Sequence, residues 1–434
     1  MRNPRHQGSE GLTIVIKLGT SSIINESTWL PQLAVLSSLA ETVCGLRKAG
    51  HRVVIVSSGA IAVGMRRMSV YKRPKILAEK QALAAIGQGR LIALWDSLFT
   101  HLDQPIAQVL ITRSDISDRP RYLNATRTLT ALLASGVVPI VNENDTLSVS
   151  EIKFGDNDTL SAITAGMVAA DYLFLLTDVD CLYTENPRKN PRAKAVTVVR
   201  DIEAVRQIVS TATLGSSLGT GGMETKLIAA ELAMAAGVAT VITHGTKPGN
   251  IVQIVSAARD PAREGPDTEA DIDLASSVEL PPRASLDEVA LPLHTIFMPR
   301  ATPLPDRRWW VLHGLAPRGR VIIDAGAYKA VLLRSRYDQS EEDKHVSEAG
   351  NGGRLLPAGI VGVEGVFAAG QAVRLAVRTQ GVDTEIARGL ANYNSQEIDR
   401  IKGMKSSEIE ATLGYVESEH VIEAITATSV PAAQ

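Results

Sequence analysis

LTIVIKLG, residues 12–19, is the stretch that decides the fold. It is an apolar run rich in β-branched residues, which is typical of a strand buried on both faces of a sheet. Similar strands are expected at 52–59, 105–112, 137–144, 171–178 and 238–245, and helices at 31–50, 75–99, 121–136, 159–170 and 223–237. This alternation predicts a three-layer αβα domain, in which a mainly parallel central sheet is covered by helices on both faces.

The composition of the 434 residues is that of an ordinary globular protein. Hydrophobic residues make up 45% and the formal net charge is -2, so the chain has no overall attraction to nucleic acid or anionic membranes. The polar start lacks the apolar core of a signal peptide, and no apolar run is long enough to span a bilayer. Cys44 and Cys181 form neither a disulfide framework nor a metal motif, so a cytoplasmic protein without membrane attachment is expected.

The composition changes near Pro261, which indicates a second domain. Residues 1–262 are expected to form the α/β domain, and the acidic, proline-bearing residues 263–295 a linker or loop extension. Residues 296–385 predict a small β-rich domain, and its polar stretch 336–353 is expected to be a disordered surface insertion. The strands of this domain are expected at 307–314, 319–326, 327–335, 359–370 and 371–378.

Polar residues gather where the expected strands of the α/β domain end. Lys17 and Gly19 close the first strand, Ser57 the second, and Thr177 with Asp178 the fifth. The loops at the carboxyl ends of parallel strands lead into helix N-termini, whose free amides favour anions. These positions therefore predict a ligand site at one edge of the sheet.

The stretch NENDTLSVSEIKFGDND, residues 142–158, collects many carboxylates and side-chain amides at another strand end. A calcium loop would need acids at alternating positions, then a turn glycine and a distant glutamate, and the stretch does not continue in that way. A solvated surface loop is the other reading, since Asn, Asp, Ser and Gly are common turn formers. The position of the stretch beside the other polar strand ends favours a ligand-binding loop.

A glycine cluster, LGTGGMETK at residues 218–226, stands directly before an expected helix. Gly221 and Gly222 can bring backbone amides close to a phosphate, and Lys226 lies in the first helical turn. The sequence lacks a Walker motif and a protein-kinase catalytic loop, so phosphate chemistry would have to use two separate lysines, Lys17 and Lys226. The alternatives are that Lys17 is simply a charged residue at the end of a strand, and that Lys226 is an ordinary solvated lysine of a helix.

Six motifs in a fixed order identify a resemblance. With KLGTS, VSSGA, NENDTLS, FGDNDTLSA, LLTD and GTGGMETK, the first 260 or so residues resemble the amino-acid kinase superfamily and, within it, the glutamate 5-kinase family. DVDCLYT and GTGGMETK are similar to its fungal members. Bacterial members usually have Gly where this chain has Cys181, so the loop is not expected to have positive φ there.

The C-terminal part extends the resemblance. GRVIIDAGAYKAV, LLPAGIVGVEGVF and ARGLANYNSQEIDRIKGMKS are similar to the PUA domain and trailing helix that many glutamate 5-kinases carry. This implies that the β-rich domain is PUA-like and that residues 386–434 form a helical tail.

The activity implied by the resemblance is phosphorylation of the γ-carboxylate of L-glutamate by ATP. The products are L-glutamyl 5-phosphate and ADP, the first step of proline biosynthesis, and Mg²⁺ would bridge the nucleotide oxygens. The carboxylate is already ionised at cellular pH, so no general base is needed and none of the eight histidines is assigned. Lys17 and Lys226 would act on the transferring phosphoryl group, with Asp158 holding both ammonium groups.

The resemblance also implies two sets of binding residues. In the substrate pocket, Asp145 suits the α-ammonium of glutamate, while Asn157 and Ser57 suit carboxylate oxygens. The implied ATP-binding residues are Lys17, Gly19, Thr177, Asp178, Thr220, Gly221, Gly222, Met223 and Lys226, and no protein metal ligand is assigned.

Two other functions stay open at this point. One is another amino-acid kinase that acts on acetylglutamate, aspartate or carbamate, and the other is a non-catalytic RNA-binding regulator. Further partners implied by the resemblance are proline as a feedback inhibitor, a separate glutamyl-phosphate reductase, and further copies of the chain in a homodimer or homotetramer.

RNA binding is raised by the PUA-like domain, because PUA domains elsewhere bind structured RNA. Residues 298–320 mix Trp309 and Trp310 with five arginines, which is how an RNA surface could look. The alternative is that the tryptophans form the core of a small β-barrel and the arginines are solvated. The arginines are Arg300, Arg307, Arg308, Arg318 and Arg320.

Overall fold

The computed structural model divides the chain into two compact units, Met1–Pro303 and Leu304–Gln434. The residues that it describes are 11–25, 27–147, 157–187, 190, 192–209, 222–257, 278–279, 291–300, 303–304, 309–315, 317–329, 353–379, 382–416 and 418–427. Of the expected linker at 263–295, the structure describes residues 278–279 and 291–295, which include a short strand at 278–279 and the start of another at 295. Of the expected insertion at 336–353, it describes Gly353 alone.

The first unit alternates strands and helices, as the sequence predicts. Its strands are β1 (Thr13–Leu18), β2 (Arg52–Ser57), β3 (Ile106–Ile111), β4 (Val138–Glu143), β5 (Tyr172–Thr177), β6 (Leu182–Tyr183), β7 (Ala195–Val196), β8 (Val198–Val199), β9 (Ala239–His244), β10 (Val278–Glu279) and β11 (Thr295–Phe297). Its helices are α1 (Thr20–Ile23), α2 (Leu33–Lys48), α3 (Ala60–Arg67), α4 (Leu77–Thr100), α5 (Arg113–Ser117), α6 (Arg119–Ala134), α7 (Asn157–Met167), α8 (Ile202–Ile208), α9 (Met223–Ala235) and α10 (Asn250–Ala257).

The main sheet of this unit has, in its described part, the strand order β10-β8-β11-β9-β5-β1-β2-β4-β3. All neighbouring pairs from β9 to β3 are parallel, which confirms the predicted sheet. The chain builds β2, β3 and β4 on one side of β1 and then crosses to β5 on the other side. The loops that follow β1 and β5 therefore lead away in opposite directions, which is where an open α/β sheet binds its ligand.

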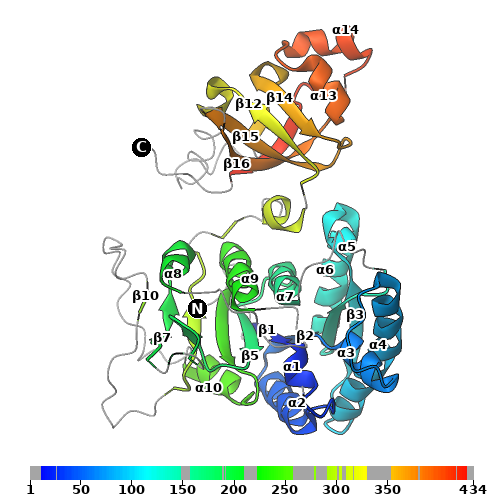
Figure 1. Ribbon diagram of the computed structural model, residues 1–434, viewed down its shortest axis with the longest axis vertical. Helices are drawn as coiled ribbons and strands as arrows, with labels where there is room; N and C mark the ends of the chain where they lie inside the picture. Colours follow the sequence, from blue (N-terminus) through cyan, green and yellow to red (C-terminus); the bar gives the residue numbers. More distant parts are fainter. Residues whose placement is uncertain are drawn as a thin grey trace. The chain divides into compact units, whose positions relative to one another are not determined.

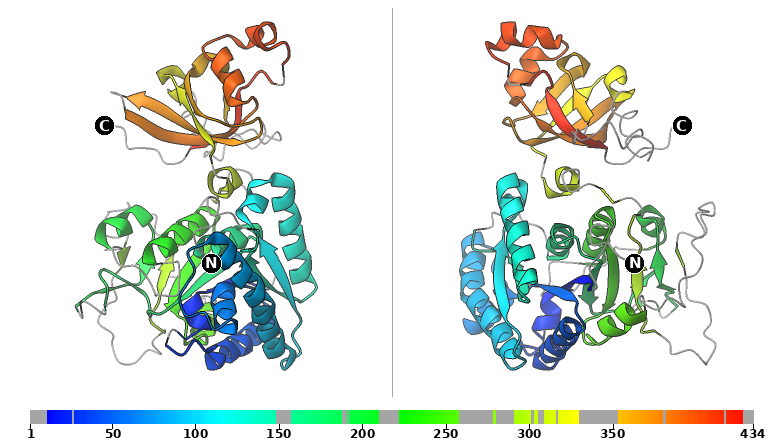
Figure 2. Two further views of the ribbon diagram at one scale, coloured as in Figure 1. Left: turned by 45° about the vertical axis from the view of Figure 1, so that its right-hand side comes forward. Right: turned by 180° about the vertical axis from the view of Figure 1, so that it is seen from behind.

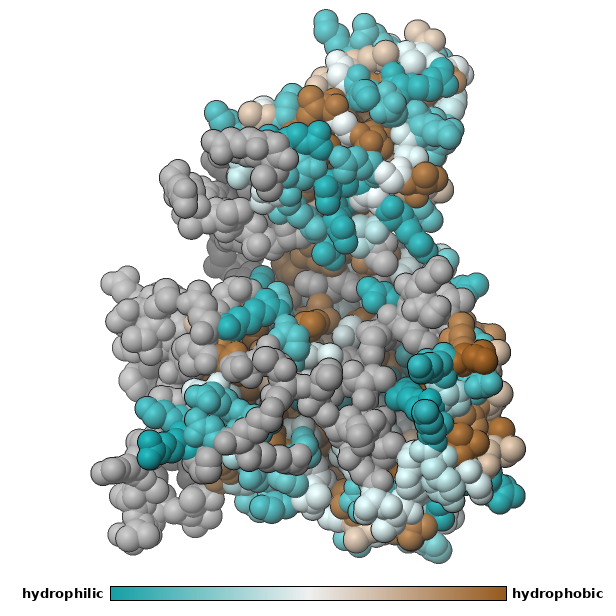
Figure 3. Space-filling view, in the orientation of Figure 1, coloured by the Kyte–Doolittle hydropathy of each residue, from teal (hydrophilic) through white to brown (hydrophobic). Residues whose placement is uncertain are grey.

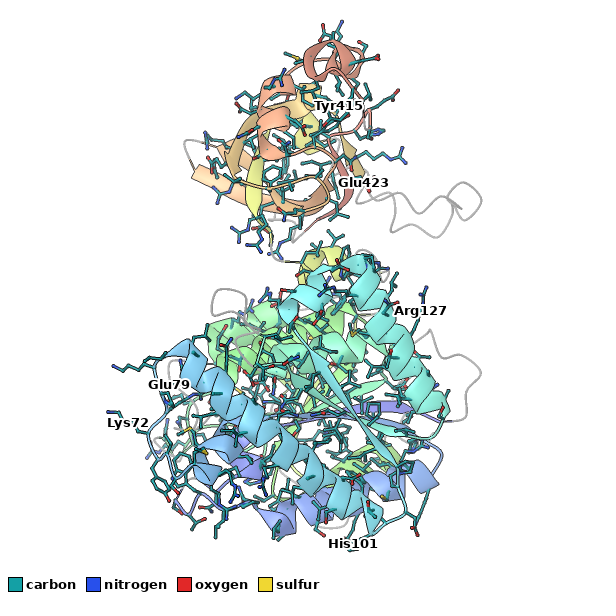
Figure 4. All side chains as sticks on the ribbon, turned by 90° about the vertical axis from the view of Figure 1, so that its right-hand side faces the viewer. Lys72, Glu79, His101, Arg127, Tyr415 and Glu423 are labelled. Atoms are coloured by element: carbon teal, nitrogen blue, oxygen red, sulfur yellow. The ribbon has the colours of Figure 1, made fainter. Side chains whose placement is uncertain are left out.

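Helices cover both faces of the sheet, so the unit has three layers. Figures 1 and 2 show α6, α7 and α9 on one face and α1, α2 and α10 on the other. Figure 4 looks onto the length of α4, which runs from near Glu79 to the labelled His101 at its end. A large hydrophobic cluster joins the strands to α2, α4 and α10 through Leu36, Leu39, Val43, Leu91, Trp95, Phe99, Ile251 and Ile254.

Alternation along β1 decides which side chains face which helical layer. Ile14, Ile16 and Leu18 belong to the cluster with α2 and α4, so Val15 and Lys17 face the layer that contains α7. All six residues of β1 are buried, as expected for a central parallel strand. Lys17 is therefore a charged side chain inside the protein.

Helices α3 and α4 approach each other backbone to backbone. A Cβ atom added to Gly87 would lie 1.8 Å from the carbonyl oxygen of Ala60, and one added to Gly64 would lie 1.9 Å from that of Leu83. Only glycine leaves room for this contact. The contact fixes the position of α4 beside the loop that follows β2.

The second unit is β-rich, as predicted. Its strands are β12 (Gly319–Ile323), β13 (Gly353–Leu355), β14 (Ile360–Gly365), β15 (Ala372–Thr379), β16 (Val382–Ala391) and β17 (Ile422–Ala427), in the sheet order β13-β17-β16-β15-β12-β14. Its helical segments are η5 (Trp310–Gly314), η7 (Pro357–Gly359), α13 (Ser395–Ile401), η8 (Ser406–Glu408) and α14 (Ile409–Leu413). One hydrophobic cluster joins this sheet to α13 and α14.

Three expectations for the second unit differ from the structure. The apolar run at 307–314 is not a strand where it is described, but the π-helical turn η5, because a short apolar run does not distinguish strand from helix. Residues 325–329 are helical, although 327–335 was expected to be a strand. Residues 386–434 are only partly helical, since β16 continues to Ala391 and β17 adds a strand to the sheet.

The surface of both units mixes hydrophilic and hydrophobic residues on the face seen in Figure 3. Among the helices of the described residues, none is both long and apolar enough to cross a membrane.

The contact between α3 and α4 gives a stability prediction. Gly87→Ala is expected to lower the free energy of unfolding by about 1–3 kcal/mol, because the added methyl group overlaps the backbone of α3. The matched control is Gly89→Ala on the same helix, where nothing lies within 4 Å and the gain in helix propensity is about 1 kcal/mol. Chemical denaturation of both variants checks the prediction, and two changes of the same sign would contradict it.

Candidate active site

The centre of the candidate site is a buried carboxylate between two buried lysines. Asp158 is 0% exposed, and its Oδ1 contacts Nζ of Lys17. Its Oδ2 lies 3.2 Å from Nζ of Lys226 and accepts a hydrogen bond of 2.8 Å from the hydroxyl of Thr225. The contact that the sequence predicts for Asp158 with both lysines is present, while the catalytic roles of the three residues stay predictions.

The charge state of Asp158 follows from these contacts. Burial acts to raise the pKa of its carboxyl group, but the two ammonium groups and the Thr225 hydroxyl outweigh burial and lower the pKa to about 2. The carboxylate is thus ionised at any physiological pH. A negative charge and two positive charges leave a net positive charge inside the protein, which suits an anionic ligand.

Three elements bring the cluster together. Lys17 comes from β1, Asp158 from the first turn of α7, and Lys226 from the first turn of α9. Helix α7 lies in the interior, because all its residues from Leu160 to Met167 are buried. The N-termini of α7 and α9 carry the positive ends of the helix dipoles, which adds to the positive potential at the site.

Adjacent serines at the end of β2 lie in different surroundings. Ser57 is fully buried, and its hydroxyl accepts a hydrogen bond of 3.2 Å from the indole nitrogen of Trp95 on α4. The hydroxyl of Ser58 instead lies 2.8 Å from Nδ2 of Asn157, at the start of α7. Strand alternation places Ser57 with Val53 and Ile55 on the face away from Lys17.

Ser58 is therefore the better candidate for a hydroxyl at the site, although the sequence led to the assignment of its neighbour Ser57. Counting alternation from the buried residues of β2 could have found it. The assignment of Ser57 to the substrate stays a prediction, and its backbone carbonyl does contact Asn157.

Asn157 is held by its amide nitrogen. Nδ2 lies 3.1 Å from the carbonyl oxygen of Ser57, 2.8 Å from the hydroxyl of Ser58, and 3.0 Å from Oδ1 of Asn142. Asn142 in turn donates its own amide to Oε1 of Gln88 at 2.9 Å. The nitrogen of Asn157 is thus already occupied, which differs from the expectation that it donates to a substrate carboxylate.

Asp145 lies half-buried in the loop that follows β4. The loop is ordered by its own backbone: the amide of Asp145 donates to the carbonyl of Glu143, and that of Asn144 donates to the carbonyl of Ile111 at the end of β3. The carboxyl ends of β3 and β4 therefore support the residue predicted to bind the substrate ammonium.

The expected nucleotide residues are only partly described. Gly19 caps α1 beside Lys17, and Gly222 and Met223 begin α9, whereas Thr220 and Gly221 lie outside the described ranges. The remaining expected pair lies at the end of β5, where the hydroxyl of Thr177 donates to the carboxylate of Asp178.

Cys181 follows β5 without positive φ, as its identity predicts. Burial raises the pKa of its thiol to about 11. Cys44 is also free and buried, and burial raises the pKa of its thiol as well.

The described residues contain no group of three or more His, Cys, Asp or Glu placed to hold a metal ion. The site is instead rich in donors: ammonium groups, hydroxyls and helix N-termini.

The candidate RNA segment of the second unit is largely accounted for by packing. Trp309 and Trp310 are 2% and 4% exposed, so they belong to the interior. Arg320 pairs with Glu364 and Asp383, which neutralise its charge. The described part of the segment thus agrees with the core alternative, and the expected Arg307 and Arg308 lie outside the described ranges.

Comparisons with known proteins show which families the chain is similar to. The profile of the amino acid kinase family matches residues 12–244, and that of the PUA domain matches residues 343–413. A Schizosaccharomyces pombe protein named "Probable glutamate 5-kinase" is 52% identical over 94% of this chain and 91% of its own length. A "Glutamate 5-kinase" of Rippkaea orientalis is 44% identical over 94% of this chain and 97% of its own length. The structure of the carbamate kinase from Giardia lamblia bound to AMP-PNP gives a TM-score of 0.42 at 15% identity, covering 56% of this chain and 96% of that one.

The central carboxylate gives a prediction about stability. Asp158→Asn leaves two buried ammonium groups without a counter-charge, which is expected to lower the free energy of unfolding at pH 7 by about 3–5 kcal/mol. The control Asp96→Asn, at an exposed position of α4, is expected to change it by less than about 0.5 kcal/mol. Denaturant unfolding measures both, and equal changes would contradict the charge cluster.

The same carboxylate predicts a pH dependence. Because its pKa of about 2 in the folded state lies below its ordinary value of 3.8, it stabilises the fold fully above about pH 4 and loses this effect as the pH falls toward 2. The stability difference between the wild type and Asp158→Asn should shrink over this range. An acid titration followed by circular dichroism checks this, and a constant difference would count against it.

Proposed function

The chain belongs to the amino acid kinase family, and we propose that it is a glutamate 5-kinase, which transfers the γ-phosphoryl group of ATP to the γ-carboxylate of L-glutamate. The observation that carries the proposal is the buried pair of ammonium groups, Lys17 and Lys226, held by Asp158 at the carboxyl end of the sheet. The identity of 44–52% to relatives named as glutamate 5-kinases, over 94% of the chain, supports the choice of substrate.

The chemistry requires positive charge more than a base. A carboxylate oxygen of the substrate forms a bond to the γ-phosphorus while the bond from that phosphorus to the β,γ-bridging oxygen breaks, and ADP leaves with the bridging oxygen. No proton is transferred, because a γ-carboxylate has a pKa of about 4.3 and is ionised. The barrier is the repulsion between two anions, and Lys17 and Lys226 reduce it.

Asp158 places a negative charge in contact with both buried lysines. A lone ammonium group in the interior would lose its proton or open the fold. The shared carboxylate keeps both side chains in place before the substrates arrive, so little reorganisation is needed during transfer.

Mg²⁺ fits the site as a companion of the nucleotide. It is commonly held by one or two carboxylates together with substrate phosphates, and the described residues offer no acidic cluster for a permanent ion. When bound with ATP, the ion would neutralise phosphate charge. Thr177 and Asp178 at the end of β5, and Gly19, Gly222 and Met223 at helix starts, would then bind the nucleotide, with Thr220 and Gly221 included by the resemblance.

The substrate pocket is assigned to the loops after β2 and β4. Asp145 is the acceptor for the α-ammonium group of glutamate, and Ser58 joins Ser57 and Asn157 as a polar group beside the sheet. A second amino-acid kinase activity, on acetylglutamate, aspartate or carbamate, is the alternative that a substrate panel would reveal. RNA binding by the second unit has the PUA domain in its favour, while the burial of Trp309 and Trp310 weighs against the segment that suggested it.

The enzyme is also proposed to have an inhibitor, a partner enzyme, an oligomeric state and a cellular location. Proline would inhibit the enzyme near the glutamate pocket, and a separate reductase would consume the reactive acyl phosphate. The chain would assemble as a homodimer or homotetramer. The free thiols of Cys44 and Cys181 fit a reducing compartment, and we place the enzyme in the cytoplasm.

A substrate panel tests the proposed function directly. ADP release should depend on L-glutamate, hydroxylamine should trap the acyl phosphate, and proline should slow the reaction. Aspartate, N-acetylglutamate and carbamate should give kcat/KM values at least about a hundredfold lower. Equal or better turnover of one of these would assign a different kinase, and the absence of turnover with all of them would favour a non-catalytic protein.

Variants of the two lysines test the mechanism. Lys17→Met and Lys226→Met are each expected to lower kcat at least about a hundredfold, because each removes one of the two positive charges that stabilise the phosphoryl group during transfer. Lys48→Met, at an exposed position in the last turn of α2, is the control and should stay within about twofold of the wild type. Asp145→Ala should mainly raise the KM for glutamate. Unchanged turnover in both lysine variants, folded by circular dichroism, would defeat the assignment.

A further inference from the structure

A chain of three side-chain amides crosses the carboxyl edge of the sheet. Gln88 lies on α4, on one face, and Asn157 begins α7, on the other face. Asn142, at the end of β4, connects them: its Nδ2 donates to Oε1 of Gln88 at 2.9 Å, and its Oδ1 accepts from Nδ2 of Asn157 at 3.0 Å. Two helices in different layers are thus joined through one strand residue.

Backbone groups fix the direction of this chain at two points. The carbonyl oxygen of Ser57 can only accept a hydrogen bond, so the atom of Asn157 that lies 3.1 Å from it must be the nitrogen. The amide of Glu143 can only donate, so the atom of Asn142 that lies 2.9 Å from it must be the oxygen. Neither amide can rotate by half a turn without losing a bond to the backbone.

The direction determines which end of Asn157 remains for a ligand. Its nitrogen has three acceptors within 3.1 Å, whereas its Oδ1 accepts no hydrogen bond within the described part of the chain. Asn157 directly precedes Asp158, the carboxylate that holds the two lysines. Beside the cluster of Asp158 and the two lysines, Asn157 therefore presents its carbonyl oxygen, which is a hydrogen-bond acceptor.

We propose that Gln88 is a positioning residue for the substrate: through Asn142 it holds Asn157 with its carbonyl oxygen free, so that Asn157 accepts a hydrogen bond from the α-ammonium group of glutamate. This rests on the proposed function. An ammonium group has three N–H donors, so it can bind this oxygen and the carboxylate of Asp145 together. Asn157 thereby selects for an amino acid over a simple dicarboxylate, rather than binding a carboxylate oxygen.

The position of Gln88 is itself secured by packing. Its neighbour Gly87 lies against the backbone of Ala60 in α3, so α4 cannot shift along the sheet without a clash. Helix α3 begins directly after Gly59, and Ser58 lies in the loop that leads into this helix. The helix that holds Gln88 and the loop that holds Ser58 are therefore one rigid arrangement around Asn157.

The test compares variants of the full-length enzyme. Gln88→Leu removes the acceptor and is expected to raise the KM for L-glutamate about tenfold, with kcat and the KM for ATP within about twofold of the wild type. Gln88→Glu keeps an acceptor oxygen for Asn142 and should restore the KM to within about threefold. Arg90→Leu, an exposed position on the same helix, is the matched control.

A double variant shows whether Gln88 acts through Asn157. If it does, adding Gln88→Leu to Asn157→Ala should not raise the KM for glutamate further, because the group being positioned is already gone. Independent, multiplying effects would overturn the proposal, as would an unchanged KM in Gln88→Leu or an equal rise in the KM for ATP.

The outcome is distinguishable from a failure of the proposed function. If the wild type shows no glutamate-dependent ADP release, the kinase assignment fails and the role of Gln88 with it. If the wild type is active and the Gln88 variants bind glutamate normally, only the positioning role fails.

Discussion

One carboxylate shared by two ammonium groups is the interaction on which the rest of the structure depends. Asp158 links β1, α7 and α9, three elements that are far apart in the sequence, and all three charged side chains are buried. Burying charges costs free energy, and opposite charges in contact offset only part of that cost. The fold therefore maintains at its centre a fixed excess of positive charge, which suits an anionic ligand.

Much of the first unit was predictable because its physical signals are local. Apolar strand runs and periodic helices lie in short windows of sequence, and Lys17 and Asp158 stand in recognisable motifs at strand ends. The difference between Ser57 and Ser58 depends on which layer each strand face meets, which no local window contains. The hydrogen bond from Asn142 to Gln88 could not be predicted at all, since it forms only once α4 and β4 are brought together by folding.

The second unit shows the limits of pattern more plainly. The run of Trp309 and Trp310 is as apolar as a strand, yet η5 packs as a helical turn against β16 and β17, because successive residues are buried together instead of alternately. Strand β17 lies within residues 386–434, which were expected to form a helical tail. Arginines that suggested a nucleic-acid surface include Arg320, which the neighbouring acids neutralise. The positive charge of Arg320 in the sequence does not by itself show that Glu364 and Asp383 pair with it in the fold.

The two cysteine thiols of the first unit have a practical consequence. Cys44 and Cys181 are both buried, and both thiols have raised pKa values, so neither presents a nucleophilic thiolate to solvent in the folded state. Alkylating reagents will modify the native enzyme only as fast as its interior opens. The rate at which Cys44 and Cys181 are alkylated therefore reports how often the interior opens. Mass spectrometry can measure this rate on the natural sequence, without an engineered label.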